Sequence, residues 1–146
     1  MSDWRQVVVR LAPRPRGIHL VTHDLLGAID LGGLDIGMVH CFVRHTSAAL
    51  SLNENASPEV RTDLAQWLDR AAPDGANYFA HTLEGPDDMA AHVKASMIGV
   101  AVTLPISRGR PLLGTWQGIY LCEFRDRAGS REVVVTAWGA PAGGSA

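Results

Sequence analysis

The sequence predicts one α+β domain, built from a mainly antiparallel β-sheet that carries two principal α-helices. The chain has 146 residues, the length of a single domain, and 47% of them are hydrophobic, as in other globular proteins. Short apolar runs with β-branched residues alternate with turn-forming residues, which is typical of strands in antiparallel pairing. Two segments, near residues 57–72 and 87–99, carry the start and stop signals of helices instead.

The N-terminal part of the chain is expected to form four strands and one short helix. Turn-forming prolines and a glycine at residues 13–17 separate the first two strands. The apolar, β-branched run that follows the short helix is typical of a buried strand. The expected strands span residues 6–11, 18–21, 37–44 and 48–53, and the short helix spans residues 24–29.

The first principal helix has the clearest signals in the chain. Ser57 can cap it, Pro58 suits its first turn, and Glu59 lies at the positive end of the helix dipole. Its apolar side chains recur at positions i, i+4, i+7 and i+8 and make one stripe for packing. These side chains are Val60, Leu64, Trp67 and Leu68.

The second principal helix is expected over residues 88–98, capped by Asp87 and buried on most sides, with only Lys94 reaching water. Asp88 and His92 lie at i and i+4 and therefore share one face. A carboxylate in that position can hydrogen-bond a ring nitrogen and fix the tautomer, which suits a general base or a metal ligand. Alternatively, Asp88 interacts only with the helix dipole and His92 is a core histidine.

Four further strands are expected after Gly99, which stops this helix. Polar, glycine-containing turns separate them, so consecutive strands should pair antiparallel. The last residues, 140–146, have little to bury and are expected to form a flexible tail, which leaves a core over about residues 5–139. The expected strands span residues 100–106, 112–116, 119–125 and 132–138.

Charge and composition exclude several classes of protein. The 13 basic and 15 acidic residues give a net charge of -2, which offers no clustered basic surface for nucleic acid or anionic lipid. The start of the chain does not resemble a signal peptide, and the longest mainly apolar run is too short for a membrane helix. Cys41 and Cys122 lie in apolar, strand-like runs and are expected to be buried free thiols, which fits a cytoplasmic protein.

Three histidines in polar segments are the first candidates for a functional site. His45 follows an apolar strand, His81 lies in a polar loop, and His92 lies on the helix that this loop enters. As three neutral imidazoles, they could converge on a divalent metal with an open position, although their spacing does not require it. The candidate metal ligands are His45, His81 and His92. The candidate catalytic residues are Asp88, His92, His45 and Glu84. The candidate ligand-binding residues next to them are Thr46 and Ser47.

A second unusual stretch lies at residues 114–118. Two glycines bracket Thr115, Trp116 and Gln117, so the backbone could approach a ligand closely while the indole offers a stacking face. Nearby, Arg110 could hold a phosphate through its guanidinium. The alternatives are a strand with a bulge and a solvated arginine turn. The candidate ligand-binding residues here and at the end of the fourth strand are Asn53, Glu54, Arg110, Thr115, Trp116 and Gln117.

Three blocks of the chain are similar to a known family. They are residues 45–50 with 53–55, residues 81–89 with 91–94, and residues 109–110 with 113–119. The sequence resembles the YjbQ family, whose members are often labelled secondary thiamine-phosphate synthases. The resemblance implies an α+β homotrimer with a polar site near the histidines and Asp88, which could hold a divalent metal such as zinc or magnesium. Phe124 stands where some relatives have His, so a ligand set using that position would be incomplete.

Three functions are compatible with these features. The resemblance favours an enzyme that joins a pyrimidine diphosphate to a thiazole phosphate, which needs cations for phosphate and a stacking surface for a flat ring. A metal-assisted phosphate-ester hydrolase, with Asp88 accepting the proton of a water, is the second. A non-catalytic trimeric protein that binds a small ligand or metal is the third. In the first two, the partner is a small phosphorylated substrate.

The pattern of apolar residues also suggests an oligomer. Runs within residues 95–104, 119–122 and 133–135 are apolar on both alternating faces. Two helices can cover little more than one side of a single sheet. We therefore expect subunit contacts in a homotrimer to cover the other side, with the site at or near a subunit boundary.

Overall fold

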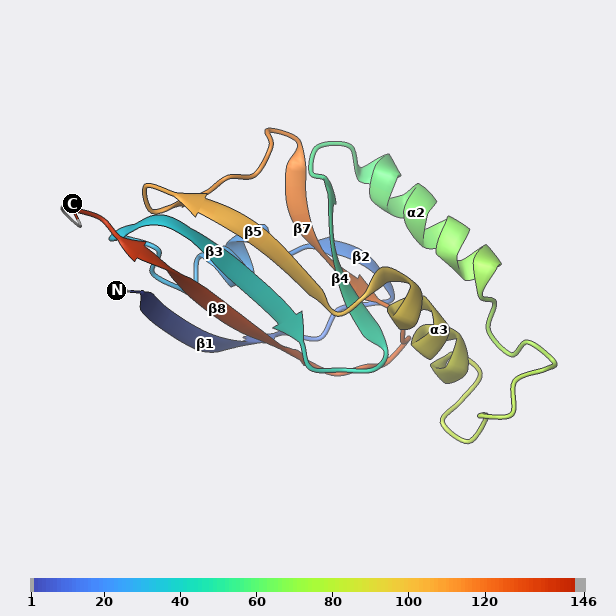
Figure 1. Cartoon of the computed structure of the whole chain (residues 1–146). Helices are drawn as coiled ribbons and strands as arrows, with labels where there is room; N and C mark the ends of the chain where they lie inside the picture. Colours follow the sequence, from blue (N-terminus) through green and yellow to red (C-terminus); the bar gives the residue numbers. More distant parts are fainter. Residues whose placement is uncertain (1, 144–146) are drawn as a thin grey trace.

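The computed structural model describes residues 2–143, and within them eight strands and three helices are formed. The strands build two antiparallel sheets, of five strands in the order β1-β8-β3-β5-β6 and of three strands in the order β2-β7-β4 (Figure 1). The elements are β1 (Asp3–Leu11), β2 (Gly17–Leu20), α1 (Thr22–Leu26), β3 (Leu34–Val43), β4 (Ala48–Glu54), α2 (Pro58–Ala71), α3 (Asp88–Ile98), β5 (Ala101–Ser107), β6 (Arg110–Pro111), β7 (Gln117–Glu123) and β8 (Arg131–Pro141).

The strand β7 lies at the centre of the packing. Its side chains at Ile119 and Leu121 join the core between the two sheets, whereas Tyr120 and Cys122 point the other way, into a second core under α2 and α3. Both helices cover the outer face of the three-stranded sheet (Figure 1). The predicted α+β fold with antiparallel strands is confirmed, but the strands form two sheets instead of one. The second sheet and the helices cover both apolar faces of β7 without a partner chain.

The outer face of the five-stranded sheet is different, because no helix among residues 2–143 covers it (Figure 1). Trp4 is 63% exposed and stacks on Trp138 with ring centroids 5.1 Å apart. Val8, Ile36 and Phe42 are also exposed on these strands. This apolar face is defined here by Trp4, Val8, Ile36, Phe42 and Trp138, and the row formed by Gln6, Thr136 and His40 crosses it.

Both principal helices form where the sequence predicts them, while the segment before β7 differs. Residues 112–116 were expected to form a strand, but they form a loop between β6 and β7. The side chain of Asn55 donates to the carbonyl oxygens of Thr115 and Gln117, and the Gln117 Oε1 accepts from the Gly114 N–H. Side chains therefore satisfy the backbone groups that a strand would use in a ladder.

The ends of the chain and the buried lysine also correct the expectations. Ala140 and Pro141 belong to β8 and pair with β3, so these two residues are not part of a flexible tail, and residues 144–146 lie outside the described residues. Lys94 is fully buried, because the carboxylate of Asp69 on α2 accepts from its Nζ at 2.6 Å. The two cysteines are buried and free, as predicted. None of the helices within residues 2–143 has the length and apolarity needed to cross a bilayer.

Candidate functional site

A cluster of two histidines and one carboxylate forms at the start of α3. Asp88 and His92 share a face of the helix, as their i, i+4 spacing predicts, and His81 reaches them from the preceding loop. The Asp88 Oδ2 lies 2.7 Å from His81 Nε2 and 3.0 Å from His92 Nε2. One ligand atom from each residue lies within 4.8 Å of the other two, so the three could hold one metal ion.

Arg125, at the end of β7, fixes the carboxylates of this cluster. Its Nη1 donates to Asp88 Oδ1 at 2.5 Å and its Nε donates to Asp87 Oδ2 at 3.0 Å. Burial alone would raise the pKa of Asp88, but the hydrogen bond from His81 and the charges of His92 and Arg125 outweigh it and hold the pKa below its ordinary value. Asp88 is therefore a carboxylate at neutral pH, able to bind a cation or accept a proton.

The tautomer of His92 is set by the main chain. Its Nδ1 lies 2.9 Å from the carbonyl oxygen of Thr46. A carbonyl oxygen only accepts, so Nδ1 carries the proton, and in the neutral ring Nε2 carries a lone pair. This lone pair faces the Asp88 carboxylate at 3.0 Å. Two acceptors at that distance repel each other unless the ring is protonated or a cation is bound by both atoms.

The spacing of the three ligand atoms suits a metal ion. Atoms bound to one zinc ion at about 2.0–2.1 Å lie about 3 Å apart when the angles between bonds are those of a tetrahedron or octahedron. The two distances to Asp88 Oδ2, 2.7 and 3.0 Å, are close to that value. Two histidines and one carboxylate are also a recurring ligand set that leaves coordination positions open.

His45 was expected to join His81 and His92, but it lies outside this cluster, where Asp88 takes the third place. The His45 Nε2 instead accepts from the backbone N–H of Glu132 at 2.8 Å. The β3–β8 ladder ends beside it, and its ring provides the acceptor that Glu132 would otherwise lack. Burial, followed by the charge of Arg131, lowers the pKa of His45 below its ordinary value.

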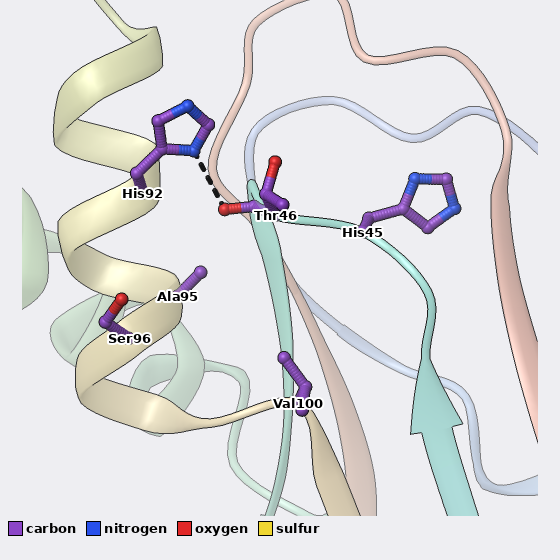
Figure 2. A pocket seen from close by; sticks show the side chains of 6 residues that line it. All are labelled: His45, Thr46, His92, Ala95, Ser96 and Val100. Carbon is purple, nitrogen blue, oxygen red and sulfur yellow. Dashed lines mark hydrogen bonds between the residues drawn. The ribbon is translucent and has the colours of Figure 1, made fainter.

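A pocket of about 410 Å³ opens beside the cluster (Figure 2), which is within the usual size of a small-molecule site. Figure 2 shows His92 and His45 on opposite sides of Thr46, with the apolar side chains of Ala95 and Val100 below them. The expected ligand-binding residue Thr46 therefore does face a pocket. The lining residues are His45, Thr46, His92, Ala95, Ser96 and Val100.

Ser47 and Glu84 have positions that differ from their expected roles. Ser47 is buried, and its Oγ accepts from Arg131 Nη2 at 3.0 Å. The same guanidinium binds the buried carboxylate of Glu123 at 2.5 Å, so Ser47 belongs to a structural network. The main-chain carbonyl oxygen of Glu84 accepts a hydrogen bond from Arg125 at 2.9 Å. Glu84 is exposed and does not belong to the cluster of His81, Asp88 and His92.

All but one of the remaining candidate residues lie at the other end of the three-stranded sheet. The β4–β7 register runs from the pair Ala48↔Glu123, near the histidines, to the pair Glu54↔Gln117. The six residue steps from one pair to the other correspond to about 20 Å. The single site expected from the sequence is therefore split in two. The residues at the distant end are Asn53, Glu54, Thr115, Trp116 and Gln117, whereas Arg110 lies on β6, at the edge of the five-stranded sheet.

This distant end has features of its own. Trp116 is 64% exposed, although the loop that carries it is tied down by Asn55 and Gln117. A second pocket of about 520 Å³ lies beside the loop. It is lined by Leu20, Thr22, His23, Asp24, Asn55, Leu113 and Gln117. Neither His23 nor Asn55 was a candidate, and no local sequence signal connects them.

Arg125 is the functional residue that the sequence reasoning missed. Its i, i+2 spacing from Glu123 would allow a pair on one face of a strand, but Glu123 is buried and pairs with Arg131. A signal was present, because Arg125 directly follows a strand whose last residues are buried, so its charge had to find partners close by. Those partners, Asp87 and Asp88, come from a helix start 37 and 38 residues earlier. Phe124 packs in the second core and is not part of the cluster.

Comparisons with known proteins agree with this fold. The sequence model of the UPF0047 protein YjbQ-like family matches residues 7–140. The UPF0047 protein YjbQ of Escherichia coli is 44% identical, over 93% of this chain and 99% of the relative. A solved structure of a conserved hypothetical protein from Thermus thermophilus is 35% identical, with a TM-score of 0.77 over 88% of this chain and 97% of that chain. A YjbQ-like protein from Sulfolobus solfataricus has a TM-score of 0.85 over 96% of this chain and 100% of its own, at 20% identity.

Proposed function

The chain belongs to the YjbQ/UPF0047 family, and we propose that it is a zinc-dependent enzyme that acts on a small phosphorylated substrate. One observation carries the proposal. His92 Nε2 lies 3.0 Å from the ionised carboxylate of Asp88, with His81 Nε2 beside them, and in the neutral ring this nitrogen carries a lone pair. A divalent cation bound by all three residues turns this repulsion into coordination. Two imidazoles favour zinc over magnesium, which prefers oxygen ligands.

The chain's own residues prepare this site for a cation. The Thr46 carbonyl orients His92, and Arg125 holds the second oxygen of Asp88. Such supporting contacts fix ligand geometry and raise metal affinity. A divalent ion bound there would polarise phosphate oxygens and lower the pKa of a water molecule.

The pocket next to His92 fits a small substrate with one apolar part. Ala95 and Val100 provide an apolar wall, and Thr46 and Ser96 provide hydroxyl groups. Neither lysine nor arginine is among the lining residues, so the pocket itself holds no fixed cation for a phosphate. A phosphorylated substrate would depend on the ion at the cluster for that charge.

The reaction that one chain supports best is hydrolysis of a phosphate ester. Water attack needs only the cluster and the pocket, because an ion bound there would lower the pKa of the attacking water. Asp88, whose pKa is held low, would hold that ion rather than accept the proton. Joining a pyrimidine diphosphate to a thiazole phosphate would also need a stacking surface. The exposed indole of Trp116 favours this second candidate, but it lies about 20 Å along the sheet from the cluster.

We also propose that the protein is a homotrimer. The number three comes from the family resemblance. The apolar face of the five-stranded sheet supports association, because its stacked tryptophans and exposed Ile36 are apolar groups that a subunit contact would remove from water.

Activity assays with and without metal test the proposed function. Protein stripped with a chelator is assayed with p-nitrophenyl phosphate, and separately with both thiamine precursors, before and after one equivalent of zinc. We expect phosphate release that zinc restores and that His92→Gln abolishes. His40→Gln is the control, because His40 lies on β3 and bonds Thr103 rather than the cluster. Product in the second assay alone would favour the transferase, and zinc binding without turnover would identify a binding protein.

A further inference from the structure

Arg61, near the start of α2, is an exception among the arginines of this chain. Of the arginines that are buried or half-buried, all except Arg61 pair with a carboxylate within residues 2–143. The paired ones are Arg5, Arg14, Arg16, Arg125 and Arg131. The Nη1 of Arg61 is enclosed by protein and has no hydrogen-bond partner within residues 2–143. A guanidinium is always charged, so Arg61 brings a positive charge without a partner to this part of the molecule.

The groups around Arg61 do not supply a negative charge. Burial raises the pKa of the Tyr120 hydroxyl and the charge of Arg61 opposes that rise, so the two groups lie close together. This hydroxyl is neutral at pH 7, and it donates its proton to the Glu54 carbonyl oxygen at 2.5 Å. The Glu54 carboxylate accepts from the Ser57 N–H at 2.9 Å, and neither it nor any other carboxylate of residues 2–143 forms an ion pair with Arg61. A charge held partly out of water without a partner is unfavourable, and a bound anion would relieve this.

Arg61 lines a pocket of about 360 Å³ between α2 and β2, called here the α2–β2 groove. The strand β2 is an edge of the three-stranded sheet, and α2 packs against it. The groove is also lined by Arg16 and Asp69, but both of these charges are paired. Arg16 pairs with Asp74 at 2.7 Å, and Asp69 pairs with the Nζ of Lys94 at 2.6 Å. Among the arginines and carboxylates that line the groove, Arg61 is therefore the one without a partner in residues 2–143.

The rest of the groove suits a small organic molecule. Its volume of about 360 Å³ is within the usual size of a small-molecule site. Ile18 and Ala65 add apolar surface, and the amide of Gln66 adds a neutral N–H donor. A guanidinium presents its N–H groups as a planar fork that fits two oxygens of a carboxylate or a phosphate. The Nε and Nη2 of Arg61 are neither bonded nor enclosed within residues 2–143, so these are the groups that an anion can reach.

We propose that the α2–β2 groove is a second binding site, which takes a small molecule by its oxyanion, a carboxylate or a phosphate group paired with the guanidinium of Arg61. The site is separate from the cluster of His81, Asp88 and His92. The strands β2 and β4 are the two opposite edges of the three-stranded sheet, and α3, which carries His92, packs on β4. Binding in the groove therefore needs neither the metal ion nor the activity proposed for the cluster.

A structural role, in which Arg61 only packs beside Tyr120, is the alternative that a test must separate. Arg61→Gln removes the charge but keeps an N–H group that can bond the Tyr120 hydroxyl. Arg61→Lys keeps the charge and loses the planar fork, and it keeps the test open if Arg61→Gln lowers Tm. Arg70→Gln is the matched control, because Arg70 is an exposed arginine on the same helix and does not line the groove.

Amide nitrogen-15 spectra of the metal-free protein locate and measure the binding, with benzoate and phenylphosphonate as probes at constant ionic strength. These probes share a phenyl ring and differ in the anion, so the tighter binder identifies the preferred group. We expect saturable shifts at residues 17–19 and 61–66 in the wild type, and binding about tenfold to a hundredfold weaker in Arg61→Gln, the range for hydrogen bonds to a charged group. Arg61→Lys should bind with intermediate affinity, and Arg70→Gln and His92→Gln should bind like the wild type.

Two results would overturn the inference. One is a wild type in which neither probe gives saturable shifts at the groove. The other is equal affinity in the wild type and both Arg61 variants, which would leave Arg61 with its structural role alone. Loss of binding in His92→Gln would place the anion at the cluster instead of the groove, and would also contradict the inference.

Discussion

Replacing Asp88 by Asn tests the cluster most directly, because one change removes a metal ligand and a buried charge. Asp88 is 4% exposed, and its carboxylate contacts His81, His92 and Arg125. Breaking a buried ion pair typically costs about 3–5 kcal/mol. Arg125 keeps its pairing with Asp87 at 3.0 Å, so we expect a smaller loss of about 2 kcal/mol in the free energy of unfolding.

Thermal unfolding with and without zinc separates the two consequences of Asp88→Asn. A loss of about 2 kcal/mol should lower Tm by about 4–8 °C in a chain of this length. Zinc at a hundred times its Kd should stabilise the wild type by about 2.7 kcal/mol, whereas the variant should show almost no shift. Asp24→Asn is the control, since its pair with Arg14 is exposed and should contribute at most about 1 kcal/mol. A zinc-dependent shift that survives in Asp88→Asn would refute the assignment of Asp88 as a ligand.

Three further predictions concern the pH dependence, the buried ion pair and the assembly. Burial raises the pKa of Cys41 to about 11 and of Cys122 to about 12, so both thiols ionise first in the unfolded chain. The free energy of unfolding should therefore be constant with respect to these thiols below about pH 8.5 and fall above it by about 1.4 kcal/mol per thiol per pH unit. A free energy from urea unfolding that is unchanged between about pH 8.5 and 9.5 would contradict this. Glu123→Gln should lower the free energy of unfolding, measured with urea, by about 3–5 kcal/mol, because Arg131 would be buried without its carboxylate partner. A decrease of less than about 1 kcal/mol would contradict that pairing. The mass measured by light scattering should be three times the chain mass of 15.7 kDa. Trp4→Lys, on the apolar face, should lower the measured mass, because it puts a charge on that face. A wild-type monomer at high protein concentration would exclude the trimer.

The parts of the fold that depend on local signals could be predicted from the sequence. The helix α3 has the predicted bounds, because its start, its apolar content and Gly99 at its end all lie within a dozen residues. The pairing of the strands could not be predicted from such local signals. Strands β7 and β8 follow each other but belong to different sheets, because β7 pairs with β2 and β4 while β8 pairs with β1 and β3. No local pattern distinguishes this from one continuous sheet, since both alternatives bury the same apolar residues.

The site shows the same division between local and distant contacts. Asp88 and His92 were placed together by helix geometry, and His81 is only seven residues from Asp88. His45 could not be placed, because its ring orientation depends on the N–H of Glu132, which is 87 residues away in the chain. The partners of Arg125 are distant in the chain too, because Asp87 and Asp88 lie 38 and 37 residues before it. Residue types identified the chemistry of the site, while tertiary contacts decided which histidine keeps which nitrogen free.

The two groups of candidate residues cannot meet within one chain. The β4–β7 ladder fixes them at opposite ends, about 20 Å apart, and no loop movement shortens a paired strand. They serve either two separate sites or one site that is shared between two copies. In a closed trimer, the cluster of one copy can face the Trp116 loop of its neighbour.

Mixing two inactive variants decides between these arrangements. His92→Gln removes the cluster and keeps the loop, whereas Trp116→Ala removes the exposed indole and keeps the cluster. If the site is shared, a co-assembled equal mixture contains some sites with an intact cluster from one copy and an intact loop from another. Random assembly makes this fraction one half times one half, so the activity should return to about a quarter of the wild-type value. If Trp116→Ala alone keeps full activity, the loop belongs to a separate site. If both variants are inactive and no activity returns on mixing, the cluster and the loop are not combined across subunits, and Trp116 must act on the cluster through the fold of its own chain.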